Sequence, residues 1–118
     1  MRPLAQTGKT FRRILCSLMH ASAGRKVMYV TGSTMLSDYS FRYALDILDS
    51  MVFHFDTRDK VITFPNNGTV KFYSAGMQLR GLRADALILD EVTTEQEKTV
   101  LSSVNALYQY DLSLDKLP

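Results

Sequence analysis

Residues 86–91 read Ala86-Leu87-Ile88-Leu89-Asp90-Glu91, which is four apolar residues in a row followed by two acids. An apolar run without alternation predicts a central strand that is buried on both faces, as in a parallel sheet covered by helices. The two acids would then lie where that strand ends. Two readings of them stay open from this stretch alone: a solvated acidic turn, or carboxylates placed to act on a ligand.

Helices and strands alternate along the rest of the chain. Apolar residues recur at helical spacing from Thr10 onward, in 36–51 and in 94–109, whereas 27–30 is a short apolar run typical of a buried parallel strand. Residues 61–74 change to a period of two around a Pro-Asn-Asn-Gly turn, which predicts a β-hairpin. This alternation predicts an α/β fold built on parallel strands. The apolar residues expected on the buried faces of the three helices are Phe11, Ile14, Leu15, Leu18 and Met19, then Leu36, Tyr39, Tyr43, Ile47, Leu48 and Met51, and finally Val100, Leu101, Val104, Leu107 and Tyr108.

Length and composition suit one domain over residues 1–118, because 46% of the 118 residues are hydrophobic and can form a core. The net charge of +2 is too small to argue for nucleic-acid binding, but the charges are unevenly distributed. Residues 1–30 carry six Lys or Arg and no acid, whereas 84–118 carry seven acids against two lysines. This distribution fits a site that joins phosphate to magnesium, and a solvated surface is the alternative. With Cys16 as the single cysteine, an intrachain disulfide is excluded, and no apolar run approaches the length of a membrane span.

The segment Gly8-Lys9-Thr10 looks like the end of a phosphate-binding loop of the form G-x-x-x-x-G-K-[ST]. In that frame Gln6, Thr7 and Gly8 would offer backbone N–H groups to phosphate oxygens. Lys9 would reach the β- and γ-phosphates of ATP, and the Thr10 hydroxyl would bind Mg²⁺. The helix that follows would point its positive end at the triphosphate.

The start of this frame departs from the pattern. Pro3 occupies the position of the first glycine, and only Met1 and Arg2 precede it. Such a loop normally follows a strand, so we expect the sheet to be incomplete at this point.

Asp90 and Glu91 supply the partner that such a loop needs. Asp90 would hold the magnesium through water, and Glu91 would orient and deprotonate the attacking water. The combination makes hydrolysis of a nucleoside triphosphate the leading functional hypothesis.

Three further stretches carry a resemblance to a known family. The chain has Asn67-Gly68-Thr69-Val70-Lys71-Phe72, then Arg80-Gly81-Leu82-Arg83-Ala84-Asp85, and then Leu87-Ile88-Leu89-Asp90-Glu91. In this order they resemble the ATPase domain of large terminase subunits, the DNA-packaging motors of tailed bacteriophages and herpesviruses. The resemblance runs from the loop to about Leu107 and is most specific over 67–91. The family's loop often has an arginine among its variable positions, which here are Leu4, Ala5, Gln6 and Thr7.

The resemblance implies an ASCE-type, RecA-like P-loop NTPase: a three-layer sandwich with a β-hairpin, its Walker A loop at the N-terminus and its Walker B strand at 86–91. It implies ATP and Mg²⁺ as ligands and ATP-driven packaging of double-stranded DNA into a procapsid. The implied partners are other terminase subunits in a ring, the small terminase subunit and the portal protein. The implied location is the host cytoplasm, at the procapsid portal and not at a membrane. The family's coupling motif and nuclease carboxylates do not follow Glu91, so we expect the chain to correspond to part of such a subunit and to show little turnover alone.

Arg80 is a second candidate catalytic residue, because it lies on a glycine-flanked turn just before the acidic strand. We expect it near the nucleotide edge of the sheet, where it could reach a neighbouring subunit's site as an arginine finger. A surface arginine is the alternative, and Arg83 fits that description better. Thr31-Gly32-Ser33 is expected to be a turn with a helix N-cap rather than a DNA contact.

Two other functions remain open from the sequence. A RecA-like domain of a helicase or translocase would share Gly8-Lys9-Thr10 and Asp90-Glu91, although the hairpin and the Arg80-Gly81 turn favour a terminase. A non-enzymatic prophage remnant would keep the pattern without turnover.

Overall fold

The computed structural model describes residues 7–49, 51 and 53–109. Within this part of the chain helices and strands alternate, as the sequence predicts. The elements in order are α1 (Thr7–Ser22), β1 (Lys26–Thr31), α2 (Thr34–Leu48), β2 (His54–Asp56), β3 (Val61–Thr63), β4 (Thr69–Ser74), β5 (Arg83–Asp90), α3 (Thr94–Ser103) and β6 (Asn105–Gln109).

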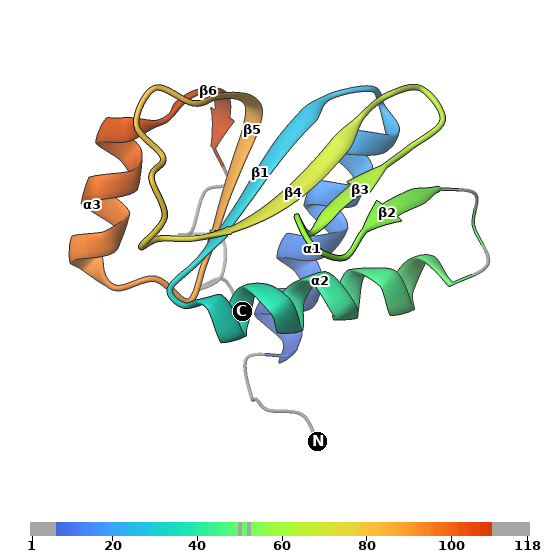
Figure 1. Cartoon of the computed structure of the whole chain (residues 1–118), viewed down its shortest axis with the longest axis horizontal. Helices are drawn as coiled ribbons and strands as arrows, with labels where there is room; N and C mark the ends of the chain where they lie inside the picture. The colour runs from blue at the N-terminus through green and yellow to red at the C-terminus, as the bar shows by residue number, and fades with distance from the viewer. Residues whose placement is uncertain (1–6, 50, 52, 110–118) are drawn as a thin grey trace.

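One six-stranded sheet forms the centre of the molecule, with the strand order β2-β3-β4-β1-β5-β6 (Figure 1). β1 pairs in parallel with both β4 and β5, and β5 pairs in parallel with β6. β3 is antiparallel to both of its neighbours, β2 and β4. The prediction of an α/β fold with a mostly parallel sheet and a hairpin is therefore confirmed.

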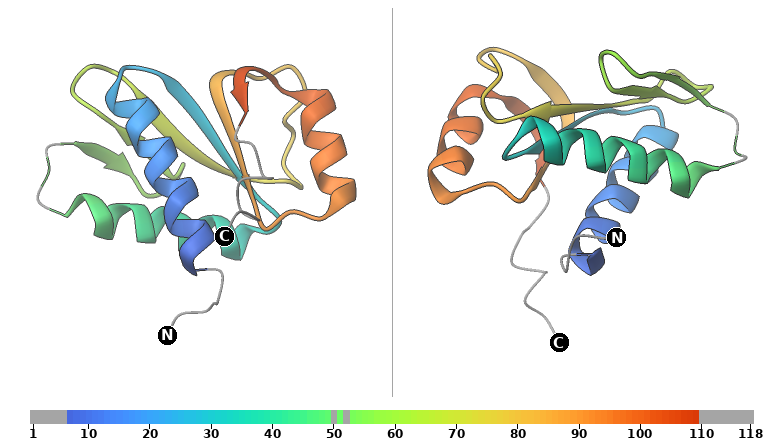
Figure 2. Two further views of the ribbon diagram at one scale, coloured as in Figure 1. Left: turned by 180° about the vertical axis from the view of Figure 1, so that it is seen from behind. Right: turned by 60° about the horizontal axis from the view of Figure 1, so that its bottom comes forward.

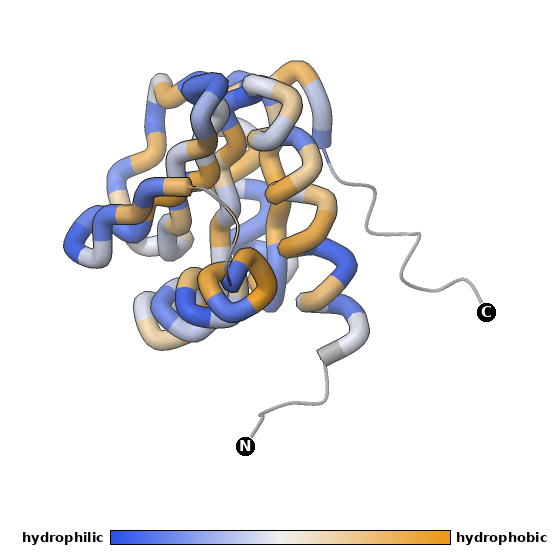
Figure 3. The backbone as a smooth tube through the Cα atoms, turned by 90° about the vertical axis from the view of Figure 1, so that its right-hand side faces the viewer, coloured by the Kyte–Doolittle hydropathy of each residue, from blue (hydrophilic) through white to orange (hydrophobic). Residues whose placement is uncertain are grey.

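Helices cover both faces of the sheet. Residues of β1 alternate between two core clusters: Val27 and Tyr29 pack with α1 and α2, whereas Met28 and Val30 pack with α3. Viewed from behind, α1 lies across the sheet (Figure 2). Hydrophobic stretches follow the inner strands, and the outer turns are mostly hydrophilic (Figure 3). The apolar run that predicts a strand buried on both faces is explained by these two cores, since Ala86–Leu89 are all buried.

The first two helices differ in detail from their predicted faces. α1 begins at Thr7, three residues before the predicted apolar stripe, and Phe11 and Met19 of that stripe are exposed. α2 ends at Leu48, and Met51 beyond it is exposed. The buried face of α2 contains two serines, because small residues let the helix approach β1 and β4 closely. Its buried residues are Ser37, Ser40, Phe41, Ala44 and Leu48.

The third predicted helix is correct only in its first part. α3 stops at Ser103, and 105–109 form strand β6, so the prediction of a helix over 94–109 is wrong there. Leu107 and Tyr108 fit helical spacing after Val100, but both are exposed in β6, so they do not form the buried face of a helix. Parallel pairing with β5 decides the outcome, because it gives the backbone of 105–109 hydrogen-bond partners along a buried strand.

The turn of the β3–β4 hairpin packs against the C-terminal end of α1. Asn66 donates its side-chain amide to the Ser22 carbonyl oxygen at 2.7 Å, and Thr69 N–H donates to the Arg25 carbonyl oxygen at 3.0 Å. Gly68 fits here because it has no side chain: a Cβ on Gly68 would lie 1.7 Å from the Ala21 carbonyl oxygen. Asn66 and Gly68 of the predicted Pro-Asn-Asn-Gly turn thus fix the hairpin to α1.

We expect Gly68→Ala to lower the free energy of unfolding by about 3 kcal/mol, because the new methyl group overlaps backbone that cannot move independently. Chemical denaturation measures this. Gly76→Ala is the matched control, since a Cβ on Gly76 has open space and the change should stay within about 1 kcal/mol. Equal stability of the two variants would contradict the packing described for the turn.

Candidate nucleotide site

The carboxyl ends of the parallel strands meet along one edge of the sheet. Ser74, Thr31 and Asp90 stand in register as neighbours on β4, β1 and β5. The first residues of α1, α2 and α3 lie at the same edge, along the bottom of Figure 1. Helix N-termini carry partial positive charge and free N–H groups, and ligands of open α/β sheets bind at this edge.

Asp90 is the centre of a buried polar network at this edge, and only 2% of its surface is exposed. The Thr10 hydroxyl donates to Asp90 Oδ2 at 3.1 Å, and the Tyr29 hydroxyl donates to the same oxygen at 2.8 Å. Arg13 Nη1 donates to Asp90 Oδ1 at 2.6 Å and forms an ion pair with it. Both carboxylate oxygens are therefore satisfied by side chains from α1 and β1.

The network pairs the buried Asp90 carboxylate with a cation and keeps Tyr29 protonated. A buried carboxylate needs a paired cation and hydrogen-bond donors, and Arg13, itself buried, provides the charge. Burial raises the pKa of Tyr29 well above its usual range, and the negative charge of Asp90 raises it further. Tyr29 thus acts as a donor that holds the carboxylate in place.

Glu91 differs sharply from its neighbour, because it is exposed and its backbone has a φ of 55°. A left-handed backbone is unusual for a residue other than Gly, Asn or Asp and costs free energy that the surrounding structure must offset. Gly32, in the turn after β1, makes room here: a Cβ on Gly32 would lie 2.5 Å from the Glu91 carbonyl oxygen. Gln96 of α3 donates to the Gly32 carbonyl oxygen at 3.2 Å, which ties the two segments together.

The remaining residues of the predicted phosphate-binding loop are placed as follows. Gly8 and Lys9 lie in the first turn of α1, and both are exposed. Thr7 is described by its backbone alone as the first residue of α1, and Gln6 lies outside the described residues. Gly8 has a negative φ, and a Cβ on it would meet no atom within 4 Å, so the fold itself does not require glycine at this position.

The donor groups at this edge suit Mg²⁺ in kind, because the ion prefers hydroxyl, carboxylate and phosphate oxygens and keeps several waters. The Thr10 hydroxyl uses its proton for Asp90, which leaves its lone pairs for an ion. Since Asp90 already accepts three hydrogen bonds, it would act on an ion through Thr10 or through water. No three His, Cys, Asp or Glu side chains of the described residues gather to hold a metal by themselves, so phosphate oxygens would have to complete the set.

Arg80 does not lie where the sequence analysis expects it. Arg80 lies just before β5, which begins at Arg83, whereas Asp90 is the last residue of that strand. At a rise of about 3.3 Å per residue, the two ends of β5 are about 23 Å apart. The adjacent Gly81 N–H donates to the Ser103 carbonyl oxygen at the end of α3, which fixes the turn at this opposite edge. The expectation that Arg80 lies near the nucleotide edge of its own chain is therefore wrong, and a role in a neighbouring subunit's site stays a prediction.

The turn after β1 agrees with the sequence analysis. Ser33 is the N-cap of α2, and its hydroxyl accepts from the Leu36 N–H at 3.2 Å. Arg83 is exposed, as expected for a solvated arginine.

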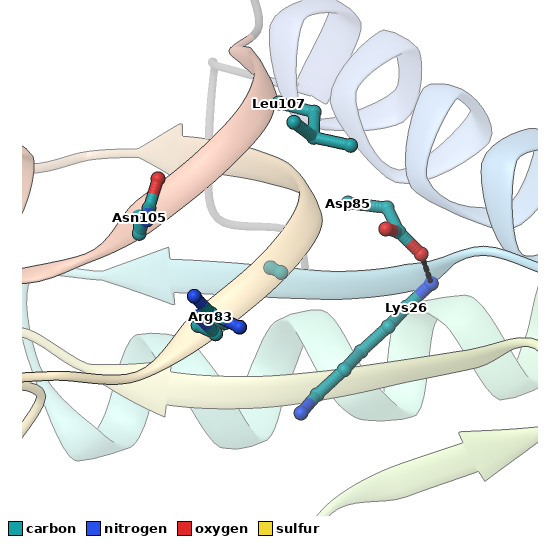
Figure 4. Close-up of a pocket in the computed structure, with 6 residues that line it drawn as sticks. Lys26, Arg83, Asp85, Asn105 and Leu107 are labelled. Carbon is teal, nitrogen blue, oxygen red and sulfur yellow. Dashed lines mark hydrogen bonds between the residues drawn. The ribbon is translucent and has the colours of Figure 1, made fainter.

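A pocket at the N-terminal ends of β1, β5 and β6 lies away from this site (Figure 4). Lys26 donates its backbone N–H to Asp85 Oδ2 at 2.8 Å there, and Arg83, Asn105 and Leu107 complete the rim. None of the residues that line it belongs to the Asp90 network. It therefore adds nothing to the candidate nucleotide site.

Arg13 and Tyr29 are the two site residues that sequence reasoning missed. Arg13 follows Thr10 by three positions, so both lie on one face of α1, which is a signal that could be read from spacing. Tyr29 carries the one polar group within the apolar run 27–30, and a buried Tyr hydroxyl needs a partner. The identity of that partner follows only from the parallel pairing of β1 with β5.

Comparisons with protein-family models, with curated proteins and with solved structures give no match to this chain. None of the helices in the described part of the chain is both long enough and apolar enough to cross a bilayer.

Proposed function

We propose that this chain binds Mg²⁺-ATP at the edge formed by the start of α1 and the end of β5, as a P-loop NTPase of the ASCE, RecA-like type. The contact between the Thr10 hydroxyl and Asp90 carries the proposal, because it joins the end of a Gly-Lys-Thr loop to an acidic strand across 80 positions of sequence. A hydroxyl and a carboxylate in contact, at the N-terminus of a helix, are what a magnesium triphosphate site requires.

Each residue then has a distinct part. The exposed Lys9 ammonium would pair with the β- and γ-phosphates, while the first N–H groups of α1 would donate to phosphate oxygens. Bound Mg²⁺ would supply charge neutralisation at the phosphates. Glu91, an exposed carboxylate next to Asp90 in the chain, would accept the proton of the attacking water. Arg13 and Tyr29 would hold the Asp90 carboxylate in position.

The finer assignment is to the ATPase domain of a large terminase subunit, which would couple this hydrolysis to packaging of double-stranded DNA. Support comes from the resemblance over 67–91, and from the hairpin turn, where Asn66 and Gly68 pack against α1. The partners would be other copies in a ring, the small subunit and the portal protein, in the host cytoplasm. Arg80 would be available to a neighbouring copy, because it is exposed at the edge opposite Asp90.

Gly8→Ala tests the phosphate-binding role of the loop separately from folding. We expect the variant to be as stable as the wild type or up to about 1 kcal/mol more stable, since Ala favours a helix and has room here. We expect it to bind Mg²⁺-ATP at least about tenfold more weakly, because the methyl group obstructs the close approach of phosphate to backbone. Calorimetric titration measures the affinity for Mg²⁺-ATP. An affinity equal to that of the wild type would mean that Gly8 has no role in phosphate binding.

A further inference from the structure

A second polar cavity of about 110 Å³ lies at the same edge of the sheet, beside β4. The start of α2 contributes Thr34 and Ser37 to its wall, and the end of β4 contributes Ser74. The turn between β2 and β3 closes it with residues 58–60. Ser74 and Asp90 are separated by β1, so the cavity is about two strand spacings, roughly 10 Å, from the Asp90 network.

Ser37 gives the clearest sign of a ligand. Only 2% of its surface is exposed, and its hydroxyl has no hydrogen-bond partner among the described residues. A buried hydroxyl without a partner costs about 1–3 kcal/mol, and buried polar groups nearly always have one. Since Ser37 lines the cavity, a bound group would give this hydroxyl the partner that the chain itself does not.

The charge and the backbone at the cavity favour an anion. Arg58, Lys60 and Lys71 line it against one acid, Asp59. Lys71 Nζ lies 5.2 Å from the centre of the Tyr73 ring, which packs in the core on the α3 side of the sheet, so Arg58 and Lys60 are the candidates for direct contact with an anion. α2 has 15 residues and leaves the N–H groups of its first turn without intrahelical acceptors, apart from Leu36, which donates to Ser33.

Hydrogen bonds within the chain fix the shape of the β2–β3 turn. Asp56 Oδ1 accepts the N–H groups of Arg58 at 2.9 Å and of Asp59 at 3.2 Å. Lys60 adopts a φ of 56°, and its carbonyl oxygen accepts from the Phe72 N–H at 3.0 Å. The two cations thus stand on a turn that is tied to β4, which lowers the entropy cost of gathering them around an anion.

We propose that this cavity binds a phosphate group, at a site separate from the proposed nucleotide site. The Ser37 hydroxyl, the first N–H groups of α2, and Arg58 with Lys60 would be its donors, which is the set that tetrahedral oxyanions select. The group can come from free phosphate or from the backbone of DNA, and both present the same oxygens. The inference does not depend on ATP hydrolysis, because it rests on residues that the Asp90 network does not contain.

The test is a nuclear magnetic resonance titration of the 118-residue chain carrying Lys9→Ala, which weakens phosphate binding at the proposed nucleotide site. One arm uses inorganic phosphate, a second uses a short DNA duplex, and sodium chloride of equal ionic strength is the reference. We expect saturable shifts of the Thr34, Ser37 and Lys60 amides with phosphate. If DNA moves the same amides and competes with phosphate, the source is the DNA backbone, and if only phosphate does so, the source is the free ion.

Ser37→Ala and Arg58→Gln are each expected to weaken this binding about tenfold, whereas Lys98→Gln, on the exposed side of α3, should leave it unchanged. Ser37→Ala should fold at least as stably as the parent, because it removes an unsatisfied buried hydroxyl. The proposal is overturned if neither ligand moves these amides more than chloride does. It is also overturned if Ser37→Ala and Arg58→Gln bind phosphate as tightly as the parent does, which would mean that the cavity holds only water.

Discussion

Replacing Glu91 by Gln is expected to reduce ATP hydrolysis about 10²–10⁴-fold, which is the usual contribution of a positioned general base. The amide of Gln cannot accept a proton from water, but it has nearly the same shape as the carboxylate. Glu91 is exposed and lies outside the buried Asp90 network, so ATP affinity and stability should stay close to those of the wild type. Steady-state hydrolysis by the full-length protein with DNA present, together with an ATP-binding titration, measures both quantities.

Glu95→Gln is the matched control for this change. Glu95 is an exposed acid in the first turn of α3, so its variant loses the same charge at a nearby position without losing the base. Its turnover should remain within a few-fold of the wild type. Wild-type turnover by Glu91→Gln, or an equal loss in Glu95→Gln, would mean that Glu91 is not the base.

Asp90→Ala is expected to lower the free energy of unfolding by about 3–5 kcal/mol, because it breaks the buried ion pair with Arg13. The Thr10 and Tyr29 hydroxyls lose an acceptor at the same time. Chemical denaturation of the wild type and the variant gives the difference directly. A loss of this size amounts to a large fraction of the stability of a small domain.

The exposed pair of Arg42 and Asp38 on α2 provides the comparison. Their side chains are 70% and 42% exposed, and Arg42 Nε donates to Asp38 Oδ2 at 3.0 Å. Asp38→Ala should cost no more than about 1 kcal/mol, since solvent screens a surface pair. A double variant, Arg13→Met with Asp90→Leu, should recover most of the loss because it removes both charges. If Asp90→Ala cost as little as Asp38→Ala, the buried ion pair would not exist in solution.

Patterns within one element predicted most of the fold. The apolar run 86–89 gave β5, the alternation over 61–74 gave the hairpin, and the spacing after Thr10 gave most of α1. The error at 105–109 arose because this short segment continues the helical spacing of α3. Only pairing with the neighbouring strand β5 makes it a strand, and β5 lies about twenty residues earlier in the sequence.

The candidate site shows the same limit. Sequence reasoning selected Thr10 and Asp90 from separate motifs, and the structure places their side chains in contact. It missed that Arg13 pairs with Asp90, because a charge in an amphipathic helix usually faces solvent, although the spacing of three places Arg13 on the same face as Thr10. It misplaced Arg80 for a related reason: the length and direction of β5 determine which edge the turn occupies.

The central claim is that the start of α1 and the end of β5 bind Mg²⁺-ATP, and Lys9 provides the most direct measurement. Lys9 is exposed, so Lys9→Ala should leave the fold intact. The titration follows the amides of Gly8, Lys9, Thr10 and Asp90 with Mg²⁺-ATP in the wild type, in Lys9→Ala and in Lys98→Ala as the control. We predict saturable shifts at these amides in the wild type and in Lys98→Ala, and at least about tenfold weaker binding in Lys9→Ala. Absence of these shifts in the wild type, or equal affinity in all three proteins, would contradict the proposed function.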